Sequence, residues 1–156
     1  MATIADEGRV SKALLHYNFR DRDHLLAAAV TTLADRITRR EREAMAAETA
    51  HSPVDVLWQQ VAAELAQGEL RALLLLGINA PAAIQSAVAQ ATHRRREVTE
   101  RTVALLFSRL RLVPRFSAAS LADAFLAFLS GLALSGAQDP RTSFDLFWLA
   151  MLGLGE

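Results

Sequence analysis

Apolar residues return every three or four positions along most of this chain, which is the period of an amphipathic α-helix. The pattern predicts one long helix that Asp21 opens and that reaches the high 40s, with arginines along its polar side. Its apolar side carries Leu26, Ala29, Val30, Leu33 and Ile37.

Helix-capping residues divide the rest of the chain into further helices. Ser52-Pro53-Val54-Asp55 starts one that Gly68 ends, and a shorter helix follows from Glu69 to Leu76. Asn79 and Pro81 start the longest, which ends before Pro114 and has a length of roughly 45 Å. One face of this helix carries Ile84, Val88, Ala91, Val98, Thr102, Leu105 and Arg109. Ser117 and Asp139-Pro140 open two more helices. We therefore predict an all-α fold.

The last helix, FDLFWLAMLGL, is apolar on nearly every side. A helix without a polar face needs cover on more than one side, which favours a homodimer over a terminal helix buried within a monomer. The residues predicted for the dimer interface are Phe125, Phe128, Leu132, Phe144, Phe147, Trp148 and Met151.

Composition narrows the function without identifying it. The chain has no cysteine, which fits a reducing cytoplasm, and its 17 basic and 17 acidic residues cancel. The run from Ala118 to Ala137 is just long enough to span a membrane, but Asp123 and its small residues favour burial in protein. The four histidines lie in separate elements, so we expect no metal, no cofactor and no enzyme activity.

The first 25 residues carry a helical hairpin pattern. Ile4 and Ala5 face inward, Gly8-Arg9 breaks the helix, and Ser11 caps a second helix that carries Leu15 and Phe19. Such a hairpin is typical of a helix-turn-helix, whose second helix lies in the major groove of DNA.

A run of residues gives the hairpin a more specific resemblance. Ile4-Ala5, Val10-Ser11, Leu15, Phe19, Arg22 and Leu25 match in order and spacing the end of a known DNA-binding domain. This segment resembles TetR/AcrR-type transcriptional regulators, and the downstream order of helices is similar. The resemblance implies a partial helix-turn-helix over residues 1–20 and an antiparallel helical bundle over residues 21–156 that binds an effector and dimerises.

The resemblance also implies which residues meet operator DNA. They are Ser11, Lys12, Ala13, Leu14, His16, Tyr17, Asn18 and Arg22. This segment departs from the family in Arg9 at the tight turn, in His16, in Asn18 and in having no first helix of the three-helix unit. We therefore expect Ile4, Val10, Leu15 and Phe19 to lack cover and this piece to be loosely held.

The family binds its effector in an apolar pocket of the body. The resemblance places that pocket at Met45, Trp58, Gln59, Val61, Leu65, Leu74 and Phe107, with Gln60 and His51 as further polar groups. HRRRE, residues 93–97, is interpreted as the solvated face of the long helix, with Arg96–Glu100 and Arg94–Glu97 pairs.

Two functions remain open at this point. The first is a ligand-responsive repressor that binds operator DNA as a dimer. The second is a ligand-binding and dimerisation module without DNA binding, which would pair with full-length relatives. Between Met1 and His24 four basic residues face four acidic ones, so DNA binding would depend on geometry more than on net charge.

Overall fold

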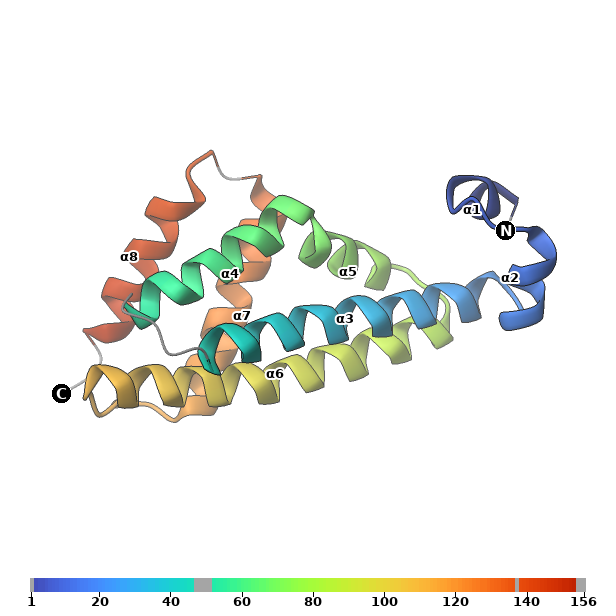
Figure 1. Cartoon of the computed structure of the whole chain (residues 1–156). Helices are drawn as coiled ribbons and strands as arrows, with labels where there is room; N and C mark the ends of the chain where they lie inside the picture. The colour runs from blue at the N-terminus through green and yellow to red at the C-terminus, as the bar shows by residue number, and fades with distance from the viewer. Residues whose placement is uncertain (1, 47–51, 137, 154–156) are drawn as a thin grey trace.

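A computed structural model of the chain describes residues 2–46, 52–136 and 138–153, and these form eight α-helices without a strand (Figure 1). The helices are α1 (Ala2–Glu7), α2 (Lys12–Asn18), α3 (Arg22–Ala46), α4 (Pro53–Gln67), α5 (Glu69–Gly77), α6 (Ala82–Leu110), α7 (Ala118–Ser135) and α8 (Pro140–Leu152). The all-α prediction is confirmed.

Side-chain caps begin several helices where the sequence predicts them. An Asp21 Oδ1 accepts from the His24 amide at 2.7 Å, and Ser117 Oγ and Asp139 Oδ1 each accept from an amide three residues on at 3.1 Å. Gly68 ends α4 with a φ of 67°, a left-handed conformation that glycine adopts without strain. Ser52 is different, because its side chain makes no cap hydrogen bond and Pro53 starts α4 alone.

The two longest helices, α3 and α6, lie side by side and run in the same direction (Figure 1). Contacts between them confirm the direction, because Asp35 meets Arg94 and Glu41 meets Thr99 further along both helices. The expected antiparallel order is therefore wrong for this central pair. The reason is that α4 and α5 carry the chain back to the start of α3 before α6 begins.

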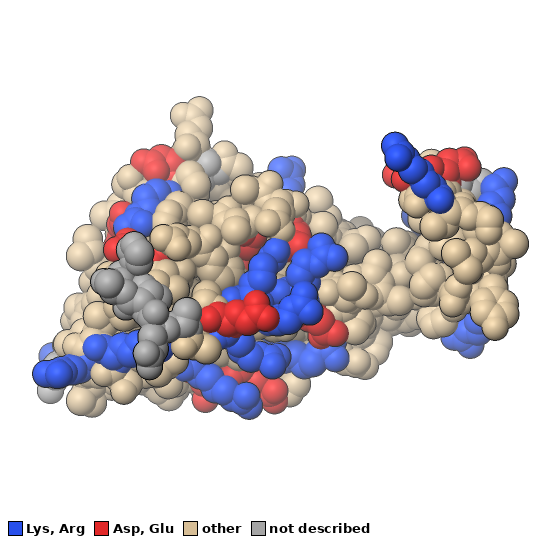
Figure 2. Space-filling model, in the orientation of Figure 1, with Lys and Arg blue, Asp and Glu red and all other residues tan. Residues whose placement is uncertain are grey.

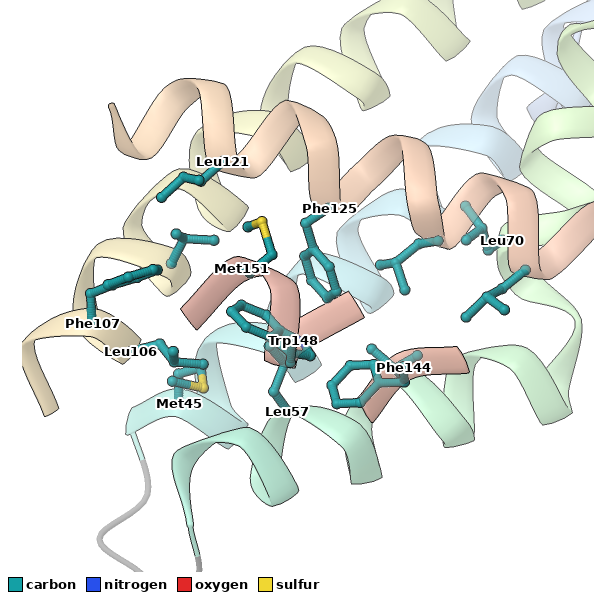
Figure 3. Packing of buried hydrophobic residues seen from close by; sticks show 14 of the residues in the cluster. Met45, Leu57, Leu70, Leu106, Phe107, Leu121, Phe125, Phe144, Trp148 and Met151 are labelled. Carbon is teal, nitrogen blue, oxygen red and sulfur yellow. The ribbon is translucent and has the colours of Figure 1, made fainter. Parts of the chain in front are cut away.

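The body, α3 to α8, contains two groups of buried apolar side chains. The larger joins α4, α6, α7 and α8 around Phe107, Phe125, Phe144 and Trp148, with contributions from α3 and α5 (Figure 3). The smaller joins α3, α5 and α6 around Val30, Ile37, Leu73, Ile84 and Ala91. Ala29 and Leu105, both assigned to apolar faces, are exposed instead.

The head, α1 and α2, lies apart at the end of the body where α3 begins (Figure 1). Its buried core consists of Ala5 and Leu15, while Ile4 and Phe19 are half-buried. The predicted lack of cover holds for Val10, which is 37% exposed, and is wrong for Leu15. Arg9 has a φ of 52° at the tight turn, the left-handed conformation that favours glycine there.

Helix α7 is long and apolar enough to cross a membrane by length and composition. A third of its residues are buried against the rest of the chain. Core helices of water-soluble proteins can have the same length and apolar composition, so these two features do not show that α7 lies in a membrane.

Candidate functional site

The eight residues predicted to contact DNA are all exposed, and they lie on α2, at its N-cap or at the start of α3. Tyr17 is the most open of the large apolar side chains, at 88% exposed. Two of the eight have a local structural use. Ser11 Oγ caps α2 by accepting from the Leu14 amide at 3.1 Å, and Asn18 Nδ2 donates to the Leu14 carbonyl at 2.8 Å.

Basic and acidic side chains share the surface of the head (Figure 2). This mixture means that no single-sign field covers it, and that affinity for phosphate would come from individual side chains such as Lys12 and Arg22. The exposed surface of α2 is therefore a geometric candidate for a DNA-contacting surface.

A cavity of about 100 Å³ lies in the body between α3, α5, α6 and α7. Its lining residues are Ala34, Ile37, Leu70, Leu73, Leu74, Val88, Ala91, Thr92, Arg95, Leu126, Leu129 and Ser130. Ala34 and Ile37 belong to α3, so the helix that follows the head also forms part of the cavity wall.

Of the residues predicted for the effector pocket, only Leu74 lines this cavity. Met45, Val61 and Phe107 are buried in the larger core, with Trp58 and Leu65 packed against it. Gln59 is exposed, and His51 lies outside the described residues. Most of the predicted residues therefore lie away from this cavity, because large apolar side chains at these positions pack into the core.

A cluster of buried charged and polar groups joins α3, α4 and α6. The Arg95 guanidinium pairs with both oxygens of Glu64, with 3.0 Å between Nη2 and Oε2. Thr99 Oγ1 donates to Glu41 Oε2 at 3.3 Å, and Gln60 Nε2 donates to Glu64 Oε2 at 3.4 Å. All of these residues are buried.

This cluster corrects the interpretation of residues 93–97 as a solvated face at Arg95, which is buried, whereas His93, Arg94 and Glu97 are exposed as predicted. Arg95 points inward, while Arg94 pairs with Asp35 and Arg96 with Asp123 on neighbouring helices rather than with Glu97 and Glu100. The sequence does hold a signal for this buried charge. Arg95 is four residues after Ala91 and three before Val98, so a charge interrupts an apolar face at helical spacing.

Burial raises the pKa of the Glu41 carboxyl, and the nearby Arg95 charge and hydrogen bonds from Thr102 and Thr99 only partly oppose this effect. Glu41 Oε1 and Gln60 Oε1 accept no hydrogen bond, and Arg95 Nε donates none, among the described residues. The cluster therefore ties α3 to α6 but leaves polar atoms unsatisfied, which costs stability.

The apolar surface of α7 and α8 differs from the predicted interface. Phe125, Leu132, Phe144, Trp148 and Met151 are buried in the chain's own core, so their assignment to a partner interface is wrong. Phe128 and Phe147 are half-buried and stack with ring centroids 4.3 Å apart. Leu134, Leu146 and Leu149 are instead the large apolar side chains exposed on these helices, at 49%, 63% and 69%.

Within the described residues, no group of histidine and carboxylate side chains has the arrangement of a metal site. A scan against protein-family models finds no match for this chain, and a search of curated proteins finds no relative. Function is therefore inferred from the head, the cavity and the exposed leucines of α7 and α8.

Proposed function

We propose that this chain is a cytoplasmic transcriptional repressor of the TetR/AcrR type that acts as a dimer and responds to a small molecule. The observation that carries the proposal is the placement of the exposed α2 surface on a hairpin apart from the body, where α3 begins. A helix held in this way is free to enter a major groove without a clash from the body. The resemblance of residues 4–25 to the family supports the same function.

The path from effector to DNA would run along α3. This helix begins at the head and contributes Ala34 and Ile37 to the cavity wall, so a bound molecule contacts the helix that sets the position of the head. An effector that binds one position of α3 better than another shifts the population of head spacings in the dimer. Only spacings that match one turn of the double helix allow both heads to bind.

Dimerisation is supported by the outer face of α7 and α8. Ala124, Ala127, Gly131 and Leu134 are exposed along one side of α7, and a Cβ added at Gly131 would meet only open space. Leu146 and Leu149 are two further large apolar side chains exposed on α8. Small residues on a helix allow a second helix to approach closely, so a second copy of the chain fits this surface.

The DNA-binding test compares two arginines that are both exposed on the body helices. Arg22 lies beside the head at the start of α3, and Arg109 lies in the last turn of α6. In a mobility-shift titration with DNA from upstream of the chain's own gene, Arg22→Ala should weaken binding and lower the slope of log affinity against log salt by about 1. Arg109→Ala removes the same charge and should leave binding unchanged.

Equal weakening by both substitutions, or retention that competitor DNA removes completely, would contradict the proposal. If the protein binds a small molecule and self-associates without any DNA complex, the second function holds and the chain is a ligand-binding and dimerisation module. The cavity and the apolar face would serve either function.

The dimer test uses two exposed leucines on different faces. Leu149→Glu places a charge in the proposed interface, whereas Leu75→Glu places the same charge on α5, where Leu75 is 50% exposed. Light scattering should give a dimer for the wild type and Leu75→Glu and a monomer for Leu149→Glu. A wild-type monomer, or partition of the wild type into lipid vesicles, would refute this interface.

A further inference from the structure

The cavity between α3, α5, α6 and α7 has walls of unequal chemistry. Its buried lining is mostly apolar, with Ala34, Ile37, Ala91 and Leu129, and Arg95 is the buried charged residue among them. Polar side chains lie at its edge, where Thr92 is exposed and Ser130 is half-buried. This arrangement orients a bound molecule with its apolar end inward.

The charge at the wall selects against ions. Arg95 is the charged residue of the lining, and its two terminal nitrogens are already bound to the Glu64 carboxylate. A second carboxyl group, that of Glu41, is close enough to Arg95 to interact with its charge. An anion would therefore meet an arginine whose charge is neutralised and two acidic groups, while a cation would meet no carboxylate at the cavity surface.

Hydrogen-bonding capacity remains for an uncharged ligand. The Thr92 hydroxyl makes no hydrogen bond among the described residues, and Ser130 Oγ donates to the Leu126 carbonyl at 2.8 Å, which leaves its lone pairs free to accept. Arg95 Nε is a buried donor without an acceptor. A hydroxyl or carbonyl oxygen is the complement of such groups.

We infer that this cavity binds a small uncharged molecule with an apolar body and one hydroxyl or carbonyl oxygen, such as a short-chain or cyclic alcohol or ketone. The inference deepens the proposed function and rests on it for the regulatory meaning of the site. With about 100 Å³, the cavity holds a body no larger than benzene, since an apolar cavity of roughly 150 Å³ binds benzene.

The test is a methyl NMR titration of the whole protein without DNA. Cyclopentanone and cyclopentanol should give saturable shifts of the Ile37 and Val88 methyl signals. Isobutyrate and isobutylammonium, which have a similar size and a charge, should leave these signals in place at the same concentrations. Shifts by either ion as large as those by the ketone, or no shift with any of the four, would overturn the inference.

Two substitutions locate the site. Ala91→Leu fills the cavity and should weaken cyclopentanol binding about tenfold or more, while Ala89→Leu adds the same atoms to an exposed position of α6 and should have no effect. Thr92→Val keeps the shape and removes the hydroxyl. It should weaken cyclopentanol binding about fivefold without affecting cyclopentane.

If Ala91→Leu does not fold, the comparison of cyclopentanol and cyclopentane binding by Thr92→Val tests the inference without it. An equal effect of Thr92→Val on cyclopentanol and cyclopentane would overturn the assigned chemistry. The NMR titration contains no DNA, so its result is independent of the mobility-shift test. If the protein binds the alcohol but forms no DNA complex, this inference stands and the proposed repressor function is refuted. If the protein forms the DNA complex but does not bind the alcohol, the repressor function stands and this inference is refuted.

Discussion

The head and the body of this protein are both built from α-helices, but they are held together very differently. The head buries Ala5 and Leu15 and exposes Leu14 and Tyr17. The body buries two apolar clusters and an ion pair between α4 and α6. Cooperative stability therefore resides in the body, and the head can open locally while the body remains folded.

This difference separates the two roles that the proposed function requires. A small core leaves most of the α2 surface free for contacts outside the chain, and a large core holds a cavity with fixed walls. Substitutions in each region test whether head and body unfold as independent units.

The largest effect should come from breaking the buried ion pair of the body. Glu64→Gln leaves the Arg95 charge without its partner, and ionised Glu41 compensates only in part. We expect a loss of about 3 kcal/mol in the free energy of unfolding, measured by urea denaturation. Glu97→Gln, which removes an exposed carboxylate beside His93, is the control and should change stability by less than about 0.5 kcal/mol.

A core substitution in the head should act on the head alone. Leu15→Ala removes one of its two buried side chains and should destabilise it by about 2 kcal/mol. We expect faster hydrogen exchange in residues 2–18 with the thermal midpoint of the body unchanged, whereas Leu14→Ala, at an exposed position, should alter neither. A fall in the main thermal midpoint with Leu15→Ala would show that head and body unfold together.

The buried carboxyl of α3 should make the body less stable as the pH rises. Because burial holds the pKa of Glu41 above its ordinary value, folding favours the protonated form. Stability is then highest below the ordinary glutamate pKa of about 4.3 and falls as the pH rises through the folded-state pKa.

Glu41→Gln removes this titration. The substitution should be stabilising by about 1 to 2 kcal/mol at pH 8, with a smaller gain at pH 5, in urea denaturation at both pH values. If Glu41→Gln is less stable than the wild type at pH 8, the prediction is wrong, because the groups around Glu41 then stabilise its ionised form.

The smallest effects compare one chemical change in both regions. Ser11 and Ser117 each cap a helix with a hydrogen bond of 3.1 Å to a backbone amide. Each change to alanine should cost about 1 kcal/mol locally. Ser117→Ala should lower the thermal midpoint by about 2 to 4 °C, while Ser11→Ala should only speed exchange in α2. Equal thermal shifts would contradict the separation of head and body.

Local signals in the sequence account for the positions of the helices. Asp21, Ser117 and Asp139 cap helices through atoms only three residues away, so their role is visible in any short window of sequence. The same holds for Arg9, where the break in the apolar pattern marks a turn with positive φ.

The buried charged cluster and the cavity are formed by contacts between distant parts of the chain, which the sequence alone does not show. Arg95 and Glu64 are 31 residues apart, and neither position reveals that the other lies against it. The cavity was missed for a related reason, since it is bounded by small side chains such as Ala34 and Ala91 and by the spacing of four helices. The aromatic residues of α8 were assigned to a partner because the sequence does not show that α4 and α7 cover them.

Hydrogen exchange of the whole protein with and without DNA from upstream of its own gene tests the central claim most directly. The account predicts that DNA slows exchange in residues 11–24 and leaves α6 to α8 unchanged, with Arg22→Ala reducing the protection. Protection confined to the body, or none in the head at DNA concentrations that form a complex, would contradict it.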